Sequence, residues 1–313
     1  MDERVRNILE QSTTKTSKIQ QLLLLGLTRR EIADLVTRGN CGFVYNVYKK
    51  MLEQGTFAPC QAGQVAVPVL NYSFTRRFGV EIEAYNCTQE KLLHELREAG
   101  IRVAIEGYTH RTTEHWKLVT DSSLSGNDTF ELVSPILAGE AGLKELETVC
   151  WVLDLCDVKV NDSCGFHVHM DAAGFSMETW KNLALTYKHL EPVIDSFMPG
   201  SRRNNQYCQS LHGISDRAIR DASTITDLQC VFNNRRYYKL NLEAYSRHRT
   251  VEFRQHSGTT NYTKMEKWIR FLNGLVTFAS AASLPDRTTL ESLPFLGEKE
   301  KLFFKLRTKK LAG

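Results

Sequence analysis

Two glutamates on one short segment are the first residues whose types and spacing suggest chemistry. In residues 78–83 (FGVEIE), the two-residue repeat of a β-strand places Glu81 and Glu83 on one face and Val80 and Ile82 on the other. Like charges at that separation are destabilising unless a cation lies between them. The pair therefore predicts half of a metal site, with a solvated strand edge as the structural alternative.

Two histidines repeat this pattern further along the chain. In residues 165–170 (GFHVHM), strand alternation places His167 and His169 on one face and leaves the apolar residues for the core. Gly165 precedes them, and a glycine in a strand allows another chain or a ligand to approach closely. The pair predicts metal ligands or phosphate contacts; a structural role is the alternative.

Two more predicted strands supply acidic groups and one strong cation. Residues 249–254 (RTVEFR) direct Glu252 and Arg254 to one face, and residues 129–134 (TFELVS) place Glu131 between apolar neighbours. Glu252 and Arg254 could simply pair with each other. Beside further carboxylates, however, a guanidinium is better suited to a phosphate group.

These side chains together predict an oxygen-rich site for divalent cations. Leaving so many carboxylates unpaired in a cleft would cost on the order of several kcal/mol each, so cations must supply the missing charge. Sites dominated by oxygen ligands select Mg²⁺ or Mn²⁺ over zinc.

The elements that must position these residues read as a mixture of strands and helices. Charge on alternate strand positions indicates a sheet with one face on helices and the other lining a site, which predicts an α+β fold with mostly antiparallel pairing. Residues 200–235 are polar and long for a connection, which favours a lid over the site. The expected strands are 74–85, 101–106, 115–120, 128–134, 165–171, 237–243 and 249–256; the expected helices are 88–99, 139–156, 176–197 and 261–282.

The N-terminal region predicts a separate helical unit. Residues 1–18 are polar and predict a flexible arm. Residues 19–53 carry apolar positions at helical spacing, a stop at Gly26, and a capping box from Thr28 to Glu31, which together resemble a helix-turn-helix unit. DNA contact by its last helix, protein docking and a structural cap are alternatives for its role. Residues 54–72 predict a linker before a main domain at 73–285.

Bulk composition does not by itself name a partner. The formal net charge of +4 over 313 residues is too small to identify a nucleic-acid binder, and the eight cysteines lack the C-x-x-C spacing of zinc knuckles. No apolar stretch is long enough for a signal core or a membrane span, so a cytoplasmic location with reduced thiols and no membrane contact is expected. Residues 286–313 predict a basic tail that forms a solvated surface helix.

At this point the motifs resemble those of a known family. The sequence is similar to the amidoligases of the carboxylate-amine ligase superfamily, relatives of glutamine synthetase and glutamate-cysteine ligase. The resemblance covers residues 74–282. It rests on the GVEIE, GFHVH and TVEFR strands, the turn at Asp121 followed by FELVSP, and Gly258, Thr259 and Asn261 before the last helix.

The resemblance implies a curved, mostly antiparallel sheet of the glutamine-synthetase-like catalytic type, which holds Mg²⁺ ions that bridge the phosphates of ATP. By position, Glu81, His167 and Glu252 match ligands of the metal shared with ATP, and Glu83 and Glu131 match ligands of a second metal near the acceptor carboxylate. The residues assigned to the nucleotide or to catalysis are His169, Arg254 and Asn261, with Glu131 also counted as catalytic; Asp121 has no assigned role.

The implied activity is ATP-dependent amide formation through an acyl phosphate. A DNA-binding regulator that senses a ligand and a metal-dependent hydrolase are the alternative functions. The carboxylate and amine substrates are not identified by the sequence. A partner of the N-terminal helices, either DNA or protein, and a homo-oligomer are left open.

Overall fold

The computed structural model describes residues 3–25, 27–53, 70–107 and 111–312. The chain divides into two compact units, residues 1–67 and 68–313, and each is considered by itself. Most of the predicted linker at 54–72, and the predicted stop at Gly26, lie outside the described residues.

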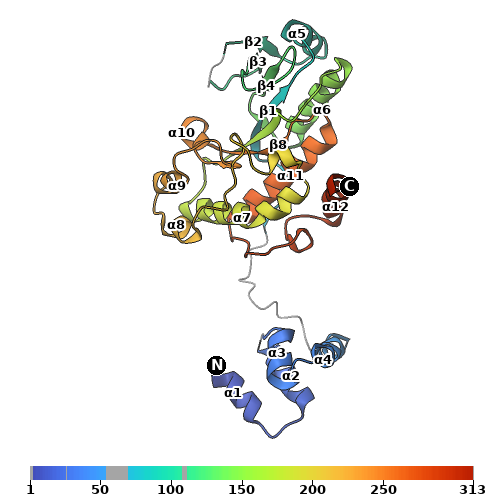
Figure 1. Cartoon of the computed structure of the whole chain (residues 1–313), viewed down its shortest axis with the longest axis vertical. Helices are drawn as coiled ribbons and strands as arrows, with labels where there is room; N and C mark the ends of the chain where they lie inside the picture. The colour runs from blue at the N-terminus through green and yellow to red at the C-terminus, as the bar shows by residue number, and fades with distance from the viewer. Residues whose placement is uncertain (1–2, 26, 54–69, 108–110, 313) are drawn as a thin grey trace. The chain divides into compact units, whose positions relative to one another are not determined.

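The larger unit is built on one open sheet (Figure 1). The strand order is β2-β3-β4-β1-β6-β8-β7, with β5 paired to β1, and all described pairs are antiparallel except β2 with β3. The predicted α+β class with mostly antiparallel pairing is confirmed. The strands are β1 (Arg77–Ala84), β2 (Val103–Ile105), β3 (Trp116–Val119), β4 (Phe130–Val133), β5 (Leu137–Ala138), β6 (Gly165–Asp171), β7 (Leu240–Asn241) and β8 (Thr250–Ser257).

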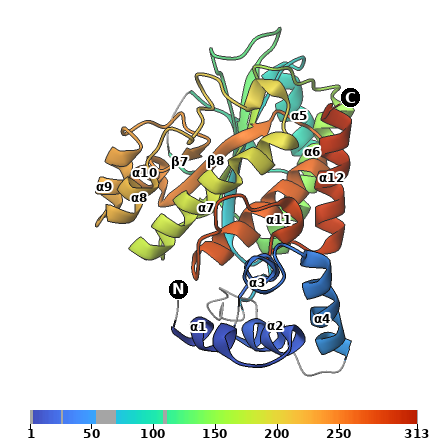
Figure 2. The ribbon, with the colours of Figure 1, turned by 60° about the horizontal axis from the view of Figure 1, so that its bottom comes forward.

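Long helices cover the apolar face of this sheet (Figures 1 and 2). Val80, Phe166 and Phe253 alternate with the polar positions of their strands and are buried beneath these helices. Burying one such side chain contributes about 1.5–3 kcal/mol to folding. No described helix is both long and apolar enough to cross a membrane. The long helices are α5 (Gln89–Glu98), α6 (Gly139–Leu155), α7 (Met177–Ser196), α11 (Tyr262–Ala279) and α12 (Glu298–Ala312).

A β-bulge interrupts the pairing of β6 with β8. Val168 pairs with Phe253, but Phe166 pairs with His256, so two residues of β8 lie opposite His167. Strict alternation would place His256 on the same face as Glu252. The bulge instead turns the His256 imidazole to the apolar side, 5.7 Å from the Phe166 ring between centroids. Burial lowers the pKa of His256 to about 3.

The predicted lid at 200–235 is more ordered than its polar composition suggests. It contains a 3-10 turn (Gly200–Arg202), α8 (Asp216–Asp221) and α9 (Ile225–Val231), anchored by buried Leu211 and Phe232. The strand predicted at 237–243 is shorter in the structure, where β7 covers Leu240–Asn241 and α10 (Ala244–His248) begins three residues after it.

The C-terminal helix α12 is not simply solvated, as the sequence predicts. Phe304 is buried, with its ring centroid 4.6 Å from that of Phe197 and 5.3 Å from that of Phe271. Arg307 donates a hydrogen bond to the Phe197 carbonyl at 2.7 Å. One side of this basic helix therefore belongs to the core of the larger unit.

The smaller unit contains α1 (Glu3–Glu10), α2 (Lys15–Leu24), α3 (Arg29–Val36) and α4 (Cys41–Glu53) around its own apolar core. The predicted capping box is confirmed, because Glu31 N–H donates to the Thr28 hydroxyl at 3.3 Å and Thr28 N–H donates to the Glu31 carboxylate at 2.8 Å. Residues 3–10, predicted as part of a flexible arm, form α1 instead. Val5 and Ile8, one helical turn apart, are buried in the core.

Candidate active site

Strand pairing brings the predicted acidic and histidine side chains together on the polar face of the sheet. Glu83 of β1 pairs with Glu131 of β4, and Glu81 of β1 pairs with His167 of β6. On the other edge of β6, His169 pairs with Glu252 of β8. Four neighbouring strands therefore converge on one site, as the strand alternation of the sequence predicts.

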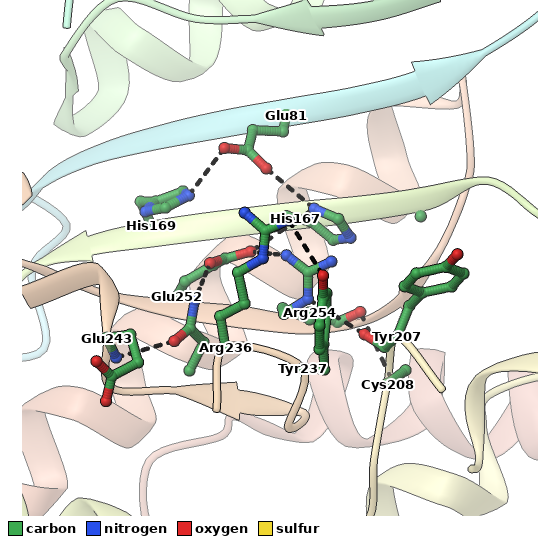
Figure 3. A network of polar contacts seen from close by, with 12 residues as sticks. Glu81, His167, His169, Tyr207, Cys208, Arg236, Tyr237, Glu243, Glu252 and Arg254 are labelled. Atoms are coloured by element: carbon green, nitrogen blue, oxygen red, sulfur yellow. Dashed lines mark hydrogen bonds and ion pairs between the residues drawn. The ribbon is translucent and has the colours of Figure 1, made fainter. Parts of the chain in front are cut away.

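Glu81, His167 and Glu252 form a first group that could hold a metal ion. One potential ligand atom from each residue lies within 4.8 Å of the others. The Nδ1 atom of His167 is 3.0 Å from a Glu81 oxygen and 3.7 Å from a Glu252 oxygen (Figure 3). This is the set that the family resemblance assigns to the metal shared with ATP.

Glu83, Glu131 and His167 form a second group within the same 4.8 Å limit. The Nε2 atom of His167 is 3.7 Å from a Glu83 oxygen, and the other Glu83 oxygen accepts a hydrogen bond from Gly165 N–H. His167 thus faces both groups through its two ring nitrogens. The family resemblance assigns His167 to the first group alone.

The carboxylates of the site do not share the same electrostatic environment. Burial raises the pKa of Glu131 well above its usual range, and the negative charges of Glu81, Glu83 and Asp121 add to the effect. Burial also acts to raise the pKa of Glu81, but hydrogen bonds from His167 and His169 outweigh it and hold that pKa low. The site therefore contains both a poorly compensated carboxyl group and a well-stabilised carboxylate.

Arg254 and Asn241 support Glu252 from two sides. Arg254 Nη1 lies 2.5 Å from one Glu252 oxygen (Figure 3). Asn241 donates to the other oxygen at 2.5 Å. Burial would lower the pKa of Arg254, but the charges of Glu252 and Glu81 raise it, so the guanidinium stays cationic. A permanent positive charge beside the two groups is suited to a phosphate.

His169 lies at the outer end of the first group. Its Nε2 atom is 3.2 Å from Glu81, and its Nδ1 atom is 3.0 Å from the Thr250 hydroxyl. Burial acts to lower the pKa of His169, but the Glu81 carboxylate outweighs it and raises the pKa. The imidazole can therefore carry a proton near neutral pH and donate a hydrogen bond to an anion.

The polar face forms the floor of a cavity of about 640 Å³. This volume lies within the range of cofactor and small-molecule sites. Asp121 lines the cavity, and its carboxylate also accepts a hydrogen bond from Ser123 N–H at 2.7 Å. The basic side chains that line the cavity are Arg77, Arg111, Lys117, Arg236, Arg247, Arg249 and Arg254.

Gly165 is required by the crowding of the site. A Cβ at this position would lie 2.6 Å from His167 Nε2 and 3.2 Å from a Glu83 oxygen. Both atoms belong to the second group, so a side chain would displace its ligands. The close approach that the sequence analysis predicts at this glycine is made by neighbouring side chains of the site.

Asn261 lies apart from the acidic and histidine groups, at the start of α11. It is outside the cavity lining and caps α11, where its side chain accepts a hydrogen bond from Lys264 N–H at 3.0 Å. Gly258, from the same motif, packs so closely on Cys164 that an added Cβ would lie 2.5 Å from its Cβ. Helix capping by itself accounts for an asparagine there, so the nucleotide contact of Asn261 stays a prediction.

Several residues of the site are not predicted from the sequence. Asn241 is concealed in a short strand whose alternation is too brief to interpret, and Glu243 and Arg236 lie just outside that strand. Buried Lys117 lies on β3 and donates to the Arg111 carbonyl at 2.8 Å. A charged residue inside the apolar run WKLV is the one signal that could have identified it.

The geometry defines a class of protein: an open α+β sheet whose polar face carries two acid-and-histidine groups beside a fixed arginine. A family model with the description "Putative amidoligase enzyme" matches residues 74–276. The match covers more than half of the chain, and the chain belongs to this amidoligase family. The predicted family is thereby confirmed, and with it a ligase-type enzyme. No curated protein matches the chain.

Proposed function

We propose that the chain is an ATP-dependent ligase that joins a carboxylate to an amine through an acyl phosphate. One observation carries the proposal: two three-residue groups share His167 on a buried polar face, and Arg254 lies beside them. Membership of the amidoligase family supports amide formation. The site chemistry supports the use of a metal-bound nucleotide.

The residues of the site fit divalent cations. Glu131 is buried next to other carboxylates, and burial together with the charges of Glu81 and Glu83 raises its pKa, so a positive partner would stabilise its ionised form. A cation held by Glu83 and Glu131 would supply that partner, and a second would be held by Glu81, Glu252 and the Nδ1 atom of His167. A neutral imidazole has one lone-pair nitrogen, so Nε2 of His167 would keep its proton and face Glu83. The oxygen-rich donor set favours Mg²⁺, with Mn²⁺ as the alternative. When bound, Mg²⁺ would neutralise phosphate charge.

The proposed reaction has two balanced steps. An oxygen of the substrate carboxylate attacks the γ-phosphorus of ATP, and the bond to ADP breaks to leave an acyl phosphate and ADP. The amine nitrogen then attacks the acyl carbon, phosphate leaves with the bonding electrons, and the nitrogen loses a proton. The products are an amide, ADP and phosphate.

The protein groups act on the charge that moves during these steps. Arg254 is held by Glu252 on one side and donates from Nε to the Tyr207 carbonyl at 3.2 Å, so its guanidinium is fixed before substrates bind. Such preorganised charge favours the transfer of a phosphoryl group. Protonated His169 would add a second positive charge beside the phosphates, on the other side of Glu81.

Two finer assignments belong to this proposal. The open sheet is taken as the glutamine-synthetase-like catalytic type, with the polar face as its catalytic surface. A cytoplasmic location is also proposed, because a ligase that consumes ATP works where ATP is abundant.

An ADP-release screen tests the function. The full chain is incubated with ATP and Mg²⁺ across mixtures of carboxylates and amines, and mass spectrometry follows products that weigh one water less than their combined partners. We expect ADP release that requires both partners. Glu83→Gln removes one charge from the second group and should abolish the release, while exposed Glu90→Gln provides the matched control.

Nucleotide dependence separates the ligase from a metal-dependent hydrolase. A hydrolase would consume its substrate with Mg²⁺ or Mn²⁺ alone, whereas the ligase requires ATP. Turnover that is unchanged when ATP is left out would overturn the proposal.

A further inference from the structure

The smaller unit presents an exposed helix face that the ligase chemistry does not use. Helix α4 buries Val44, Val47 and Met51 in the core of the unit. At 100° per residue, Gly42, Asn46 and Lys49 lie on the opposite side of the helix. The exposed residues of this face are Gly42, Phe43, Tyr45, Asn46, Lys49 and Lys50, hereafter the α4 face.

Helices α2 and α3 hold α4 in a fixed orientation (Figure 2). The turn from α3 into α4 is tight, since Arg38 and Gly39 both adopt positive φ and the Thr37 hydroxyl donates to the Asn40 carbonyl at 3.0 Å. The Asn40 side chain then accepts from Phe43 N–H at 3.1 Å and so defines the start of α4. The first turns of the α4 face are therefore positioned by the fold.

Positive charge gathers around the α4 face. The Arg29 guanidinium lies over the rings of Tyr45 and Tyr48, 5.6 Å and 5.1 Å from their centroids, which holds this charge from α3 beside α4. The acidic residues within 29–50 are Glu31, which caps Thr28, and Asp34. The basic residues in this stretch are Arg29, Arg30, Arg38, Lys49 and Lys50.

We propose that the smaller unit binds double-stranded DNA, with the α4 face in the major groove. An α-helix with its side chains is about 10–12 Å across, which matches the major-groove width of about 12 Å. Gly42 permits close approach, Asn46 can read adenine through two hydrogen bonds, and Phe43 can contact a thymine methyl group. Arg29 and Lys50 flank these residues and would contact phosphates on either side.

Charge favours DNA over a protein partner. A protein-docking helix of this kind would present a mainly apolar stripe, whereas Asn46, Lys49 and Lys50 occupy much of the α4 face. The proposal is independent of the proposed ligase function, since its residues belong to the smaller unit alone.

Fluorescence anisotropy with the full chain tests this inference. The probe is a labelled 30-base-pair duplex of mixed sequence, titrated at about 50 mM and 200 mM salt. We expect duplex binding that weakens as salt rises, because phosphate contacts release counterions. Lys50→Glu should weaken binding at least about 10-fold and make the salt dependence shallower. Exposed Lys299→Glu on α12 applies the same charge change elsewhere and should leave both values unchanged.

Selection from a random duplex pool tests the base contacts. The unaltered chain should enrich a short motif that contains adenine, and Asn46→Ala should relax the preference at that base while duplex affinity falls less than in Lys50→Glu. Circular dichroism and thermal unfolding confirm that each variant is folded, and Lys50→Ala serves as a milder second variant. The proposal is overturned if the full chain fails to bind the duplex at low salt, binds single strands equally well, or is unaffected by both Lys50 variants.

Discussion

The two faces of the large sheet are formed by the same strands but have different roles, one in stability and the other in the candidate site. Along β8, Val251 and Phe253 are buried under the helices, while Glu252 and Arg254, between and beside them, point into the cavity. The apolar face provides the burial that stabilises the fold. The polar face holds like charges that oppose folding unless a cation joins them. Stability and chemistry are thus separated by one residue along the strand.

The largest expected effects come from neighbouring substitutions on opposite faces. Glu252→Gln should lower ADP release more than about 100-fold, because it removes a proposed ligand and the partner of Arg254, yet the chain should stay folded. Phe253→Ala should cost about 3–5 kcal/mol of unfolding free energy through the cavity it leaves. Denaturant unfolding and ADP release, measured on both variants, check the separation. If Glu252→Gln unfolds as readily as Phe253→Ala, the two faces do not divide the work in this way.

A glycine pair sharpens the comparison at the edge of the site. Gly165→Ala should displace His167 and cost about 1–3 kcal/mol, with loss of Mn²⁺ binding, since its Cβ would lie 2.6 Å from the His167 ring. Gly174→Ala meets no atom within 4 Å and should be neutral in both measurements. Mn²⁺ titration followed by electron paramagnetic resonance, with thermal unfolding alongside, reads both effects. Intact Mn²⁺ binding in Gly165→Ala would argue against the second group as a ligand set.

Glu131→Gln tests whether the polar face opposes folding without a cation. The metal-free variant should be more stable by on the order of 1 kcal/mol, because a buried charge next to Glu83 is removed. Because the pKa of Glu131 is raised in the folded state, the folded chain holds the Glu131 proton at pH values where the unfolded chain has lost it. The free energy of unfolding therefore falls as pH rises above the unfolded pKa of about 4.3. In the Glu131→Gln variant the free energy of unfolding should depend less on pH, and added Mn²⁺ should no longer raise it. A less stable metal-free variant would contradict the account.

The smallest effect at neutral pH is expected on the apolar face. His256 has its pKa lowered to about 3, so between that value and about 6.5 the unfolded chain takes up a proton that the folded chain does not. Stability should therefore fall on acidification by up to about 1.4 kcal/mol per pH unit within this window. His256→Gln should remove that part of the slope in urea unfolding series from pH 7 to pH 4. An unchanged slope would place the protonated ring in contact with water.

Much of the site follows from strand alternation alone. Glu81, Glu83, His167 and Glu252 lie on long strands whose apolar partners reveal the face, so their convergence is predictable. The order in which strands pair cannot be predicted from any single strand. The position of His167 between the two groups is therefore seen only in the structure.

The remaining differences arise where tertiary contacts override local pattern. Asn241 lies on a strand of two residues, which is too short to show the alternation of apolar and polar side chains. Asn261 is the N-cap of α11, and the residue type alone does not distinguish a helix cap from a ligand-binding residue. The helix α1 depends on Val5 and Ile8 meeting the rest of its core, whereas local composition indicates disorder.

The extra residue in β8 changes which side chains face the cavity before and after the bulge. Up to Arg254 the even-numbered side chains face the cavity, and from His256 onward an even number faces the helices. Deletion of Gln255 would restore regular alternation along β8 and leave the side chains at both ends of the strand on their present faces. It would remove the hydrogen bonds of Gln255 with Tyr187 and Asp195. Loss of Val251 would instead rotate the preceding Thr250 away from His169, so tolerance to length change is confined to the irregular point.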